Sequence, residues 1–180
     1  MGNFNIIVGK CGEYSQSFKK KKTKHNYGLN RMSFTGEYYN LLDQKNRLSI
    51  PAKFRNSLHP NNNKTFILSR GFDKCLFLYP LEEWKIVEEQ LSSLSSINNK
   101  NRNFIRNIVR YAHYVKFDSQ GRIAVPDILL SYANIDKEVI VIGMLKKIEL
   151  WNKNTLDKYE KQKDFLSNED FEDLADKINF

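Results

Sequence analysis

Two stretches of the chain share one order of apolar and polar positions, and each predicts a strand, a tight turn and a returning strand. The first strand is predicted from Phe34 to Leu42, where aromatic residues and Thr are frequent. A turn follows at residues 43–46, and the next four positions alternate between polar and apolar. Leu48 and Ile50 therefore point towards a core, whereas Arg47 points to the opposite face.

The second stretch repeats the first closely. Asp43–Pro51 is DQKNRLSIP and Asp118–Pro126 is DSQGRIAVP, at a constant offset of 75 positions (118 minus 43, 126 minus 51). A later part repeats at an offset of 72, for instance Gly71 with Gly143, so the second copy has a shorter connection. Such length changes fall in the loops of duplicated domains. We therefore expect the copies to close on each other as pseudo-symmetric halves of one domain.

The residues of the two turns suit tight turn geometry. Asp43 and Asp118 stand at the first turn position, where a carboxylate can accept hydrogen bonds from backbone N–H groups. Asn46 and Gly121 occupy equivalent positions. Because Asn and Gly tolerate a left-handed backbone best, a positive φ is predicted at both.

Short helices and a second hairpin are predicted in each copy. Proline begins a helix after each repeated strand, and the hairpins span 65–79 and 138–151. The residues of the short helices expected to face the core are Phe54, Leu58, Leu129 and Ala133.

Two further helices carry apolar faces. One covers 102–111, with Phe104, Ile105, Ile108 and Val109 expected inward and with Arg102, Arg106 and Arg110 as an outer basic ridge. This ridge could touch nucleic acid, but a solvated face or a subunit contact is the favoured interpretation. The other helix follows a capping signal at Ser167 and presents Phe171, Leu174, Ala175 and Ile178. That second face needs a partner, in its own chain or in a neighbour.

The predicted fold is α+β and β-rich, in five segments. Residues 1–31 form a basic arm that we expect to be poorly ordered, 32–94 the first repeat, and 95–111 a linker and helix. Residues 112–151 form the second repeat and 152–180 the C-terminal helices.

Charge is concentrated in the arm. The net charge is +8, and residues 1–31 contribute seven basic residues against one acid. The arm grips phosphates without specificity, or is a solvated extension, or is an extension created by a wrongly assigned start codon with Met32 as the alternative start. An extension without a function is the favoured interpretation.

Several functional classes lack support in the sequence. The three histidines and two cysteines have no metal-ligand spacing, and no nucleophile elbow or phosphate-binding glycine loop occurs. No apolar run approaches the length of a membrane span. We therefore expect no enzyme, cofactor, metal, membrane contact or small-molecule substrate, and we expect Cys75 to be a buried thiol in a reducing cytosol.

The best candidate for function is the repeated Asp-x-x-x-Arg. Aspartate and arginine could simply pair across their turn, but an exposed pair contributes only about 0–1 kcal/mol. Arginine can also donate two hydrogen bonds to a phosphate or to the O6/N7 edge of guanine. The first copy groups four cations with Asp43, namely Lys45, Arg47, Lys53 and Arg55. The second copy sets Arg122 against Asp118 and Asp127, so it is expected to complete the barrel or meet another subunit.

Several motifs in order resemble the MraZ family, of the AbrB/MazE/MraZ swapped-hairpin class. The motifs are Gly36-Glu37-Tyr38, Asp43-x-Lys45-x-Arg47, Pro51-Ala52-Lys53-Phe54-Arg55, Arg70-Gly71-Phe72-Asp73-Lys74-Cys75-Leu76, Tyr79-Pro80-Leu81-Glu82-Glu83-Trp84, Asp118-x-x-Gly121-Arg122 and Ile142-Gly143. The resemblance implies a swapped-hairpin β-barrel made from two intrachain repeats with flanking helices. It also implies a bacterial repressor of the cell-division and cell-wall gene cluster that assembles into rings. DNA binding would then involve Asp43, Lys45 and Arg47, with Asp118 and Arg122. Asn46, where the family has glycine, and the N-terminal arm are departures.

Three hypotheses follow. The first is a sequence-specific, double-stranded DNA-binding regulator in the cytoplasm, associated with the nucleoid, that binds short tandem promoter repeats as a ring. In this hypothesis Arg47 reads a base edge, while Lys45, Lys53 and Arg55 hold phosphates. The second is a ring-forming protein-interaction scaffold with only non-specific DNA affinity. The third is an enzyme subunit, which would need a pocket with converging ionisable groups.

Overall fold

The computed structural model describes residues 32–161 and 167–177. The predictions for the arm and for Ile178 lie outside these residues. The strands are β1 (Phe34–Leu41), β2 (Arg47–Ser49), β3 (Thr65–Arg70), β4 (Leu76–Pro80), β5 (His113–Lys116), β6 (Arg122–Ala124), β7 (Glu138–Leu145) and β8 (Lys147–Trp151). The helices are α1 (Ala52–Asn56), the 3-10 helix η1 (Pro60–Asn62), α2 (Leu81–Ser92), α3 (Asn99–Val109), α4 (Asp127–Ala133), α5 (Lys153–Glu160) and α6 (Asn168–Lys177).

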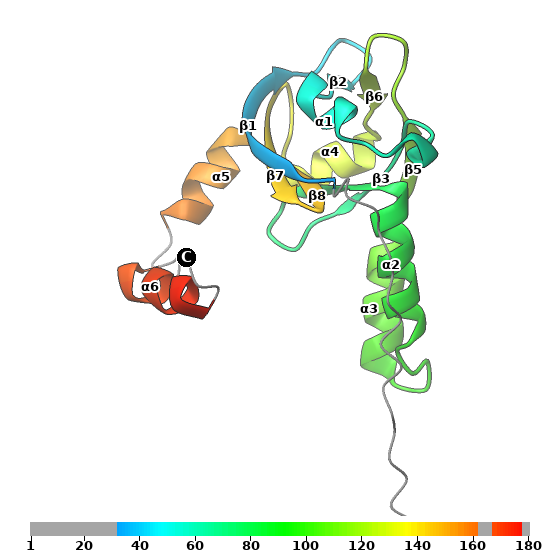
Figure 1. The fold of residues 1–180 in the computed structure, drawn as a ribbon. Helices are drawn as coiled ribbons and strands as arrows, with labels where there is room; N and C mark the ends of the chain where they lie inside the picture. The colour runs from blue at the N-terminus through cyan, green and yellow to red at the C-terminus, as the bar shows by residue number, and fades with distance from the viewer. Residues whose placement is uncertain (1–31, 162–166, 178–180) are drawn as a thin grey trace, which may run out of the picture.

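The strands exchange partners between the two repeats. A six-stranded antiparallel sheet has the order β1-β7-β8-β4-β3-β5, and a two-stranded sheet pairs β2 with β6. Exchanging each strand of the first copy for its equivalent in the second leaves both orders unchanged. The first strand of each copy therefore lies beside the hairpin of the other copy (Figure 1). This is the swapped-hairpin barrel with two intrachain repeats and flanking helices, as predicted.

The core lies where the repeats meet. Leu48 and Ile50 of the first copy and Ile123 and Val125 of the second are buried in one cluster. Phe54 of α1 and Leu129 of α4 cover this cluster at equivalent positions. The alternation read from the sequence is confirmed, because the apolar positions are buried while Arg47 remains half-exposed. Burial of these side chains on folding is the main contribution to barrel stability.

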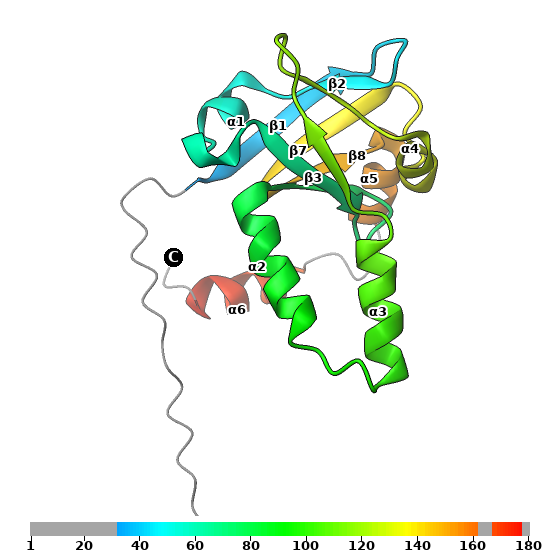
Figure 2. The same ribbon diagram turned by 90° about the vertical axis from the view of Figure 1, so that its right-hand side faces the viewer.

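The helical connections differ from a simple reading of the sequence. The polar segment 59–64 contains η1, and Asn62 is fully buried. Its amide joins two elements, since Nδ2 donates to the Thr65 carbonyl and Oδ1 accepts from the Leu81 N–H. The inward placement of Phe104 and Val109 is wrong within the described chain, because they are 44% and 49% exposed. Helices α2 and α3 project from the barrel as a pair, so part of the apolar face of α3 is not covered by any other element of the described residues (Figure 2).

Candidate nucleic-acid interface

Each repeated aspartate organises its own turn. Asp43 Oδ1 accepts hydrogen bonds from the backbone N–H groups of Lys45 (2.8 Å) and Arg47 (3.0 Å). Asp118 Oδ1 accepts from those of Gln120 (2.9 Å) and Arg122 (3.0 Å). The predicted turn chemistry is confirmed in both copies. The turns therefore present their arginines from a fixed backbone.

The last residue of each turn has the left-handed backbone that the sequence predicted. Asn46 has a φ of 52° and Gly121 a φ of 79°. Gly121 also has a steric reason to be glycine, because an added Cβ would lie 2.5 Å from Cζ of Arg55. Arg55 donates from Nε to the carbonyl of Ile50 at 3.0 Å, so its guanidinium lies beneath the second turn.

Strands β2 and β6 bring the two turns to one end of the barrel. Arg47 pairs with Ala124, Leu48 with Ile123 and Ser49 with Arg122. Beyond the strands, the N–H of Ile50 donates to the carbonyl of Gly121, and that of Val125 donates to the carbonyl of Asn46, each at 2.9 Å. The strand of each copy therefore hydrogen-bonds to the last residue of the turn in the other copy. In Figures 1 and 2 both turns lie at the end opposite the α2–α3 pair. We call β2, β6 and their turns the two-turn ribbon.

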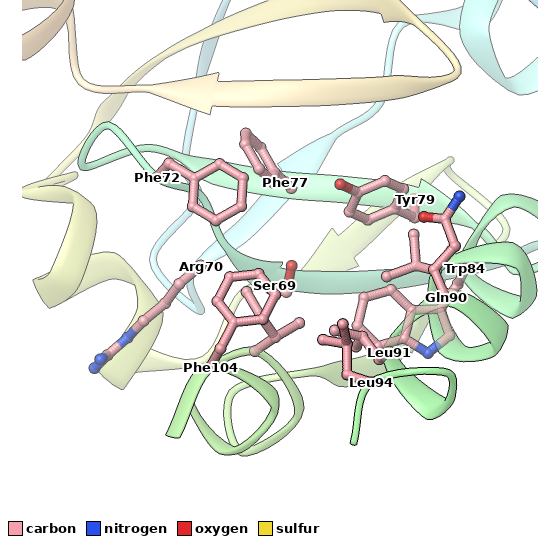
Figure 3. A pocket seen from close by; sticks show the side chains of 12 residues that line it. Ser69, Arg70, Phe72, Phe77, Tyr79, Trp84, Gln90, Leu91, Leu94 and Phe104 are labelled. Carbon is pink, nitrogen blue, oxygen red and sulfur yellow. The ribbon is translucent and has the colours of Figure 1, made fainter. Parts of the chain in front are cut away.

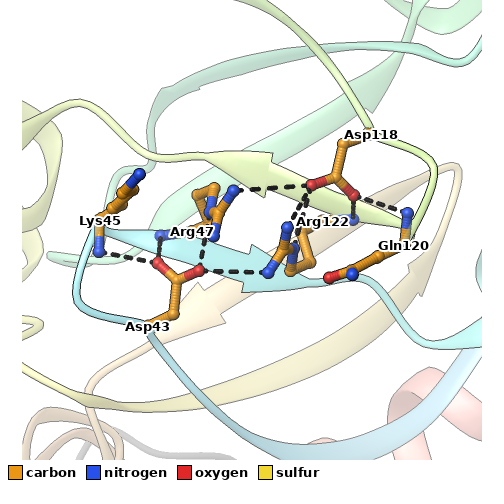
Figure 4. A network of polar contacts seen from close by, with 6 residues as sticks. All are labelled: Asp43, Lys45, Arg47, Asp118, Gln120 and Arg122. Carbon is orange, nitrogen blue, oxygen red and sulfur yellow. Dashed lines mark hydrogen bonds and ion pairs between the residues drawn. The ribbon is translucent and has the colours of Figure 1, made fainter.

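The four repeated charges form a single row across the ribbon (Figure 4). Within each copy, arginine pairs with its own aspartate, with Arg47 Nε 2.7 Å from Asp43 Oδ2 and Arg122 Nη2 2.8 Å from Asp118 Oδ2. Between copies, Arg122 Nη1 lies 3.5 Å from Asp43 Oδ2, and Arg47 Nη1 lies 3.9 Å from Asp118 Oδ2. Pairing across the turn, which the sequence left open as an alternative to a functional role, is present in both copies, and the structure adds the pairs between copies.

The two arginines differ in how far they are engaged. Arg122 donates from Nε and Nη2 to Asp118 and from Nη1 to Asp43, and its side chain is 24% exposed. Among the described hydrogen bonds, the Arg47 side chain donates only from Nε, and it is 32% exposed. Arg47 can therefore turn its Nη groups towards a ligand with less loss of internal bonding. Of the two pseudo-symmetric arginines, Arg47 is therefore the more available to a ligand.

The carboxylates of the ribbon strongly favour their charged form. The side-chain hydrogen bond from Arg122 lowers the pKa of Asp118 from 3.8 to about 2, with the Arg122 backbone N–H adding to the effect. For Asp43 the backbone N–H of Arg47 is the largest cause of a lowered pKa. Both aspartates are therefore ionised at neutral pH and hold the guanidinium groups in place.

The other predicted cations are not part of the row. The Lys45 side chain is exposed at the tip of the first turn. Lys53 Nζ lies 3.5 Å from Thr35 Oγ1, near the start of β1, whereas Asp43 follows the end of that strand. At about 3.3 Å per residue the 8 residues of β1 span roughly 26 Å. The structure therefore gathers Asp43, Lys45, Arg47, Asp118 and Arg122, and it leaves Lys53 apart.

One ribbon residue and one ribbon contact were not predicted from the sequence. Gln120 occupies the position equivalent to Lys45, and the offset of 75 could have identified it. The backbone conformation of Asn46 was predicted, but its side-chain contact was not: Nδ2 donates to Asp127 Oδ1 at 2.6 Å. Asp127, which lowers the local charge of the second copy, therefore holds the turn of the first copy in place. No local signal in the sequence indicates that contact between copies.

Within residues 32–161 and 167–177, no group of three or more His, Cys, Asp or Glu side chains is placed to hold a metal ion. Over the same residues, no helix has the length and apolar character needed to cross a bilayer. Cys75 is buried, as predicted, and burial raises the pKa of its thiol to about 12.

Comparison with known proteins places the chain in a family. The family model described as "MraZ protein, putative antitoxin-like" matches twice, over residues 33–107 and 108–178. A relative from Clostridium acetobutylicum is 43% identical over 146 residues, which are 81% of this chain and 96% of the relative. Relatives from Clostridium tetani and Pediococcus pentosaceus are each 41% identical with the same coverage. All three are named "Transcriptional regulator MraZ", which agrees with the expectation of a protein that is not an enzyme. With two family matches that together span well over half of its length, the chain belongs to the MraZ family.

Proposed function

We propose that this protein is a DNA-binding transcriptional regulator that contacts the double helix through the two-turn ribbon. The observation that carries the proposal is the placement of Arg47, a partly exposed guanidinium on a paired strand. Among the described residues its Nη groups make no hydrogen bond, and Nη1 forms only the long ion pair with Asp118 at 3.9 Å. The name of the relatives supports regulation of transcription. The major groove of B-DNA admits a two-stranded β-ribbon, which is the form that β2 and β6 take.

The row of charges prepares the arginines for this task. An arginine held by a carboxylate has fewer conformations to lose when it binds, so more of its hydrogen-bond energy contributes to affinity. Asp43 and Asp118 hold the arginines through Nε, the nitrogen nearest the stem. For Arg47 this leaves the outer edge of the guanidinium directed towards a base. We assign base contact to Arg47, with Arg122 as the weaker second contact.

The surrounding cations bind the sugar–phosphate backbone in this proposal. Lys45 at the tip contacts a phosphate beside the groove, and Lys53 contacts one farther along the duplex. Arg55 has its Nε engaged by the Ile50 carbonyl, so we assign it a positioning role beneath Gly121 with a phosphate contact through its remaining nitrogens.

At the finer level, we propose a repressor of the bacterial cell-division and cell-wall gene cluster that acts in the cytoplasm at the nucleoid. Subunits assemble into a ring, each bound weakly to one of several short tandem repeats in the promoter. Linked weak contacts give high combined affinity without any new contact in each subunit. The family resemblance in the sequence motifs and the duplicated Asp-x-x-x-Arg support this assignment.

A binding assay on the region upstream of the protein's own gene tests the proposal. Residues 1–31 are deleted so that the basic arm cannot contribute, and affinity is compared with that for shuffled DNA of equal length at one salt concentration. Selective binding that is lost when single repeats are altered supports the regulator. Equal affinity for native and shuffled DNA would favour the scaffold hypothesis instead.

A further inference from the structure

Arg70 lies at the edge of an apolar cavity and directs its charge away from it. The cavity has a volume of about 310 Å³ and lies between α2, α3 and the β3–β4 hairpin, and Arg70 is the one charged residue among those that line it. In Figure 3 its guanidinium points away from the labelled apolar side chains. The charged end of Arg70 therefore belongs to the surface beside the cavity.

Two tyrosines pack against this guanidinium. Its Cζ lies 3.3 Å from the ring centroid of Tyr111 and 4.4 Å from that of Tyr132. Tyr132 of α4 is itself held in place, because its hydroxyl donates to the carbonyl of Gly71 at 2.8 Å. Contact with aromatic faces stabilises a guanidinium without using the N–H groups at its edge. The rings therefore position Arg70 and leave its hydrogen-bond donors to another partner.

These donors have no acceptor in the part of the chain that the structure describes. The Arg70 side chain makes no hydrogen bond or ion pair there, and its Nε is buried without a partner. By contrast, Arg47 and Arg122 both pair with carboxylates. A charged donor that is removed from water and left unpaired is unfavourable. Arg70 is therefore a positioned guanidinium that lacks a counter-charge.

Two further cations share the same rings. Lys74 Nζ lies 4.7 Å from the Tyr132 centroid, and Arg110 Cζ lies 5.4 Å from the Tyr111 centroid. Both charges are therefore within about 9 Å of the Arg70 guanidinium, which is inside the distance of about 10 Å over which 0.1 M salt screens charges. Neither cation forms an ion pair with a described residue. The three positive charges thus act together at this surface.

We propose that Arg70, Lys74 and Arg110 bind the phosphate group of a small molecule. The planar guanidinium matches two oxygens of such a group. Asp73, the acid of the same hairpin, forms no ion pair within the described residues, so the cluster favours a ligand with more than one negative charge. A phosphate monoester carries about −1.5 to −2 at neutral pH, whereas a carboxylate carries only one negative charge. Arg70 is also partly buried, so a small group reaches its edge more readily than another folded surface.

The position of the cluster argues against DNA as the source of the phosphate. Arg70 is the last residue of β3 and Tyr111 precedes β5, on the side of the barrel from which α2 and α3 project. The two-turn ribbon lies at the opposite end (Figures 1 and 2). A duplex bound to the ribbon would therefore not reach these cations. The inference does not depend on the proposed function, because phosphate binding is measured without DNA.

Isothermal titration calorimetry of the full-length chain with inorganic phosphate, at constant ionic strength set with chloride, tests the site. Arg70→Gln removes the guanidinium and should weaken phosphate binding by on the order of tenfold or more. Lys74→Asn combined with Arg110→Gln removes two exposed charges and should weaken it by roughly two- to fivefold per charge. Asparagine suits the first of these positions, because Lys74 has a φ of 57°.

The matched control is Lys116→Gln combined with Lys137→Gln, which removes two exposed lysines elsewhere and should bind phosphate as the wild type does. Every variant keeps the basic arm, so phosphate binding by the arm is common to all and cancels in the comparison. Circular dichroism checks that each variant is folded. If Arg70→Gln does not fold, the Lys74 and Arg110 variant still tests the site, because it leaves the contact of Arg70 with both rings in place.

Four results would overturn the proposal. The first is equal phosphate affinity for the wild type and both site variants. The second is acetate binding as tight as phosphate, which would indicate a carboxylate site. Weaker DNA binding by Arg70→Gln in phosphate-free buffer, without a phosphate effect, would assign the cluster to the DNA backbone. Dissociation of an oligomer by the same variant would assign it to an acid of a second copy. Normal phosphate binding by a protein without DNA selectivity would overturn only the regulator proposal.

Discussion

Replacing Arg47 with alanine should separate DNA recognition from folding. The substitution removes the Nε contact to Asp43 at 2.7 Å and the longer contact to Asp118 at 3.9 Å. Because both partners are about one-third exposed, these pairs contribute only about 0–1 kcal/mol. Asp43 keeps its hydrogen bonds from the Lys45 and Arg47 backbone N–H groups. We therefore expect the melting temperature to fall by no more than about 2–4 °C.

The loss in DNA binding should be much larger. A bidentate contact between arginine and guanine contributes about 1–3 kcal/mol of discrimination, which corresponds to roughly 5- to 150-fold in affinity. Arg122→Ala is the matched comparison, because Arg122 is the pseudo-symmetric equivalent but gives three of its nitrogens to Asp118 and Asp43. Its replacement should destabilise the second turn more than Arg47→Ala destabilises the first, and should relax base preference less.

Fluorescence anisotropy with a panel of operators, each altered at one base pair, measures both effects at a fixed salt concentration. For Arg47→Ala, affinity should become insensitive to one base pair and should stay sensitive at the others. If the variant binds the whole panel as the wild type does, Arg47 contacts no base and its exposure has been misinterpreted. If Arg122→Ala produces the larger loss of preference, the assignment of the two arginines is reversed.

Three further predictions follow from the same contacts. Lys53→Ala should weaken binding to all sequences alike and lower the slope of log affinity against log salt by about one, whereas a change confined to one sequence would contradict a phosphate contact. Gly121→Ala should lower the free energy of unfolding in urea by about 1–3 kcal/mol, because φ is 79° and the new Cβ meets Arg55. Asn46→Gly, at the equivalent position, is the control and should cost less. Since folding lowers the pKa of Asp118 to about 2, the carboxylate contributes stability above pH 3.8 that is lost as pH falls towards 2. The difference in melting temperature between wild type and Asp118→Asn should therefore shrink over that interval, and an NMR titration of Asp118 near 3.8 would contradict the pairing.

Local chemistry explains why the turns could be predicted. Asp43, Asn46 and their equivalents act within four residues of the chain, and the alternation after each turn fixes which side chains face the core. The contacts of Asp43 with Arg122 and of Asn46 with Asp127 join residues about 80 positions apart. Such contacts depend on which strand lies beside which, and the sequence repeat indicated only that the copies would meet.

The exposed apolar residues of α3 show a second limit of prediction from the sequence. Periodicity identified the apolar face of the helix, but it does not specify what covers that face. Phe104 and Val109 were expected to face inward, and the structure leaves them partly exposed at the surface. Arg55 shows the same limit for charge, because its place among four cations suggested a phosphate contact while its Nε is bound to the Ile50 carbonyl. Counts of charge along the chain do not reveal which groups are already engaged.

The unequal arginines have a consequence for the kind of operator that the proposed regulator can bind. A ribbon with two equivalent halves would bind a site and its inverted copy equally well, and would favour palindromes. Here Arg47 is more available than Arg122, and the position of Lys45 in the first turn is occupied by the uncharged Gln120 in the second. Each subunit therefore has a direction along the duplex, and subunits related by rotation in the proposed ring all keep the same direction. On this argument direct repeats should be bound and inverted repeats of the same sequence should not. An operator with one repeat inverted tests the point, since only a ribbon with equivalent halves would retain full affinity for it.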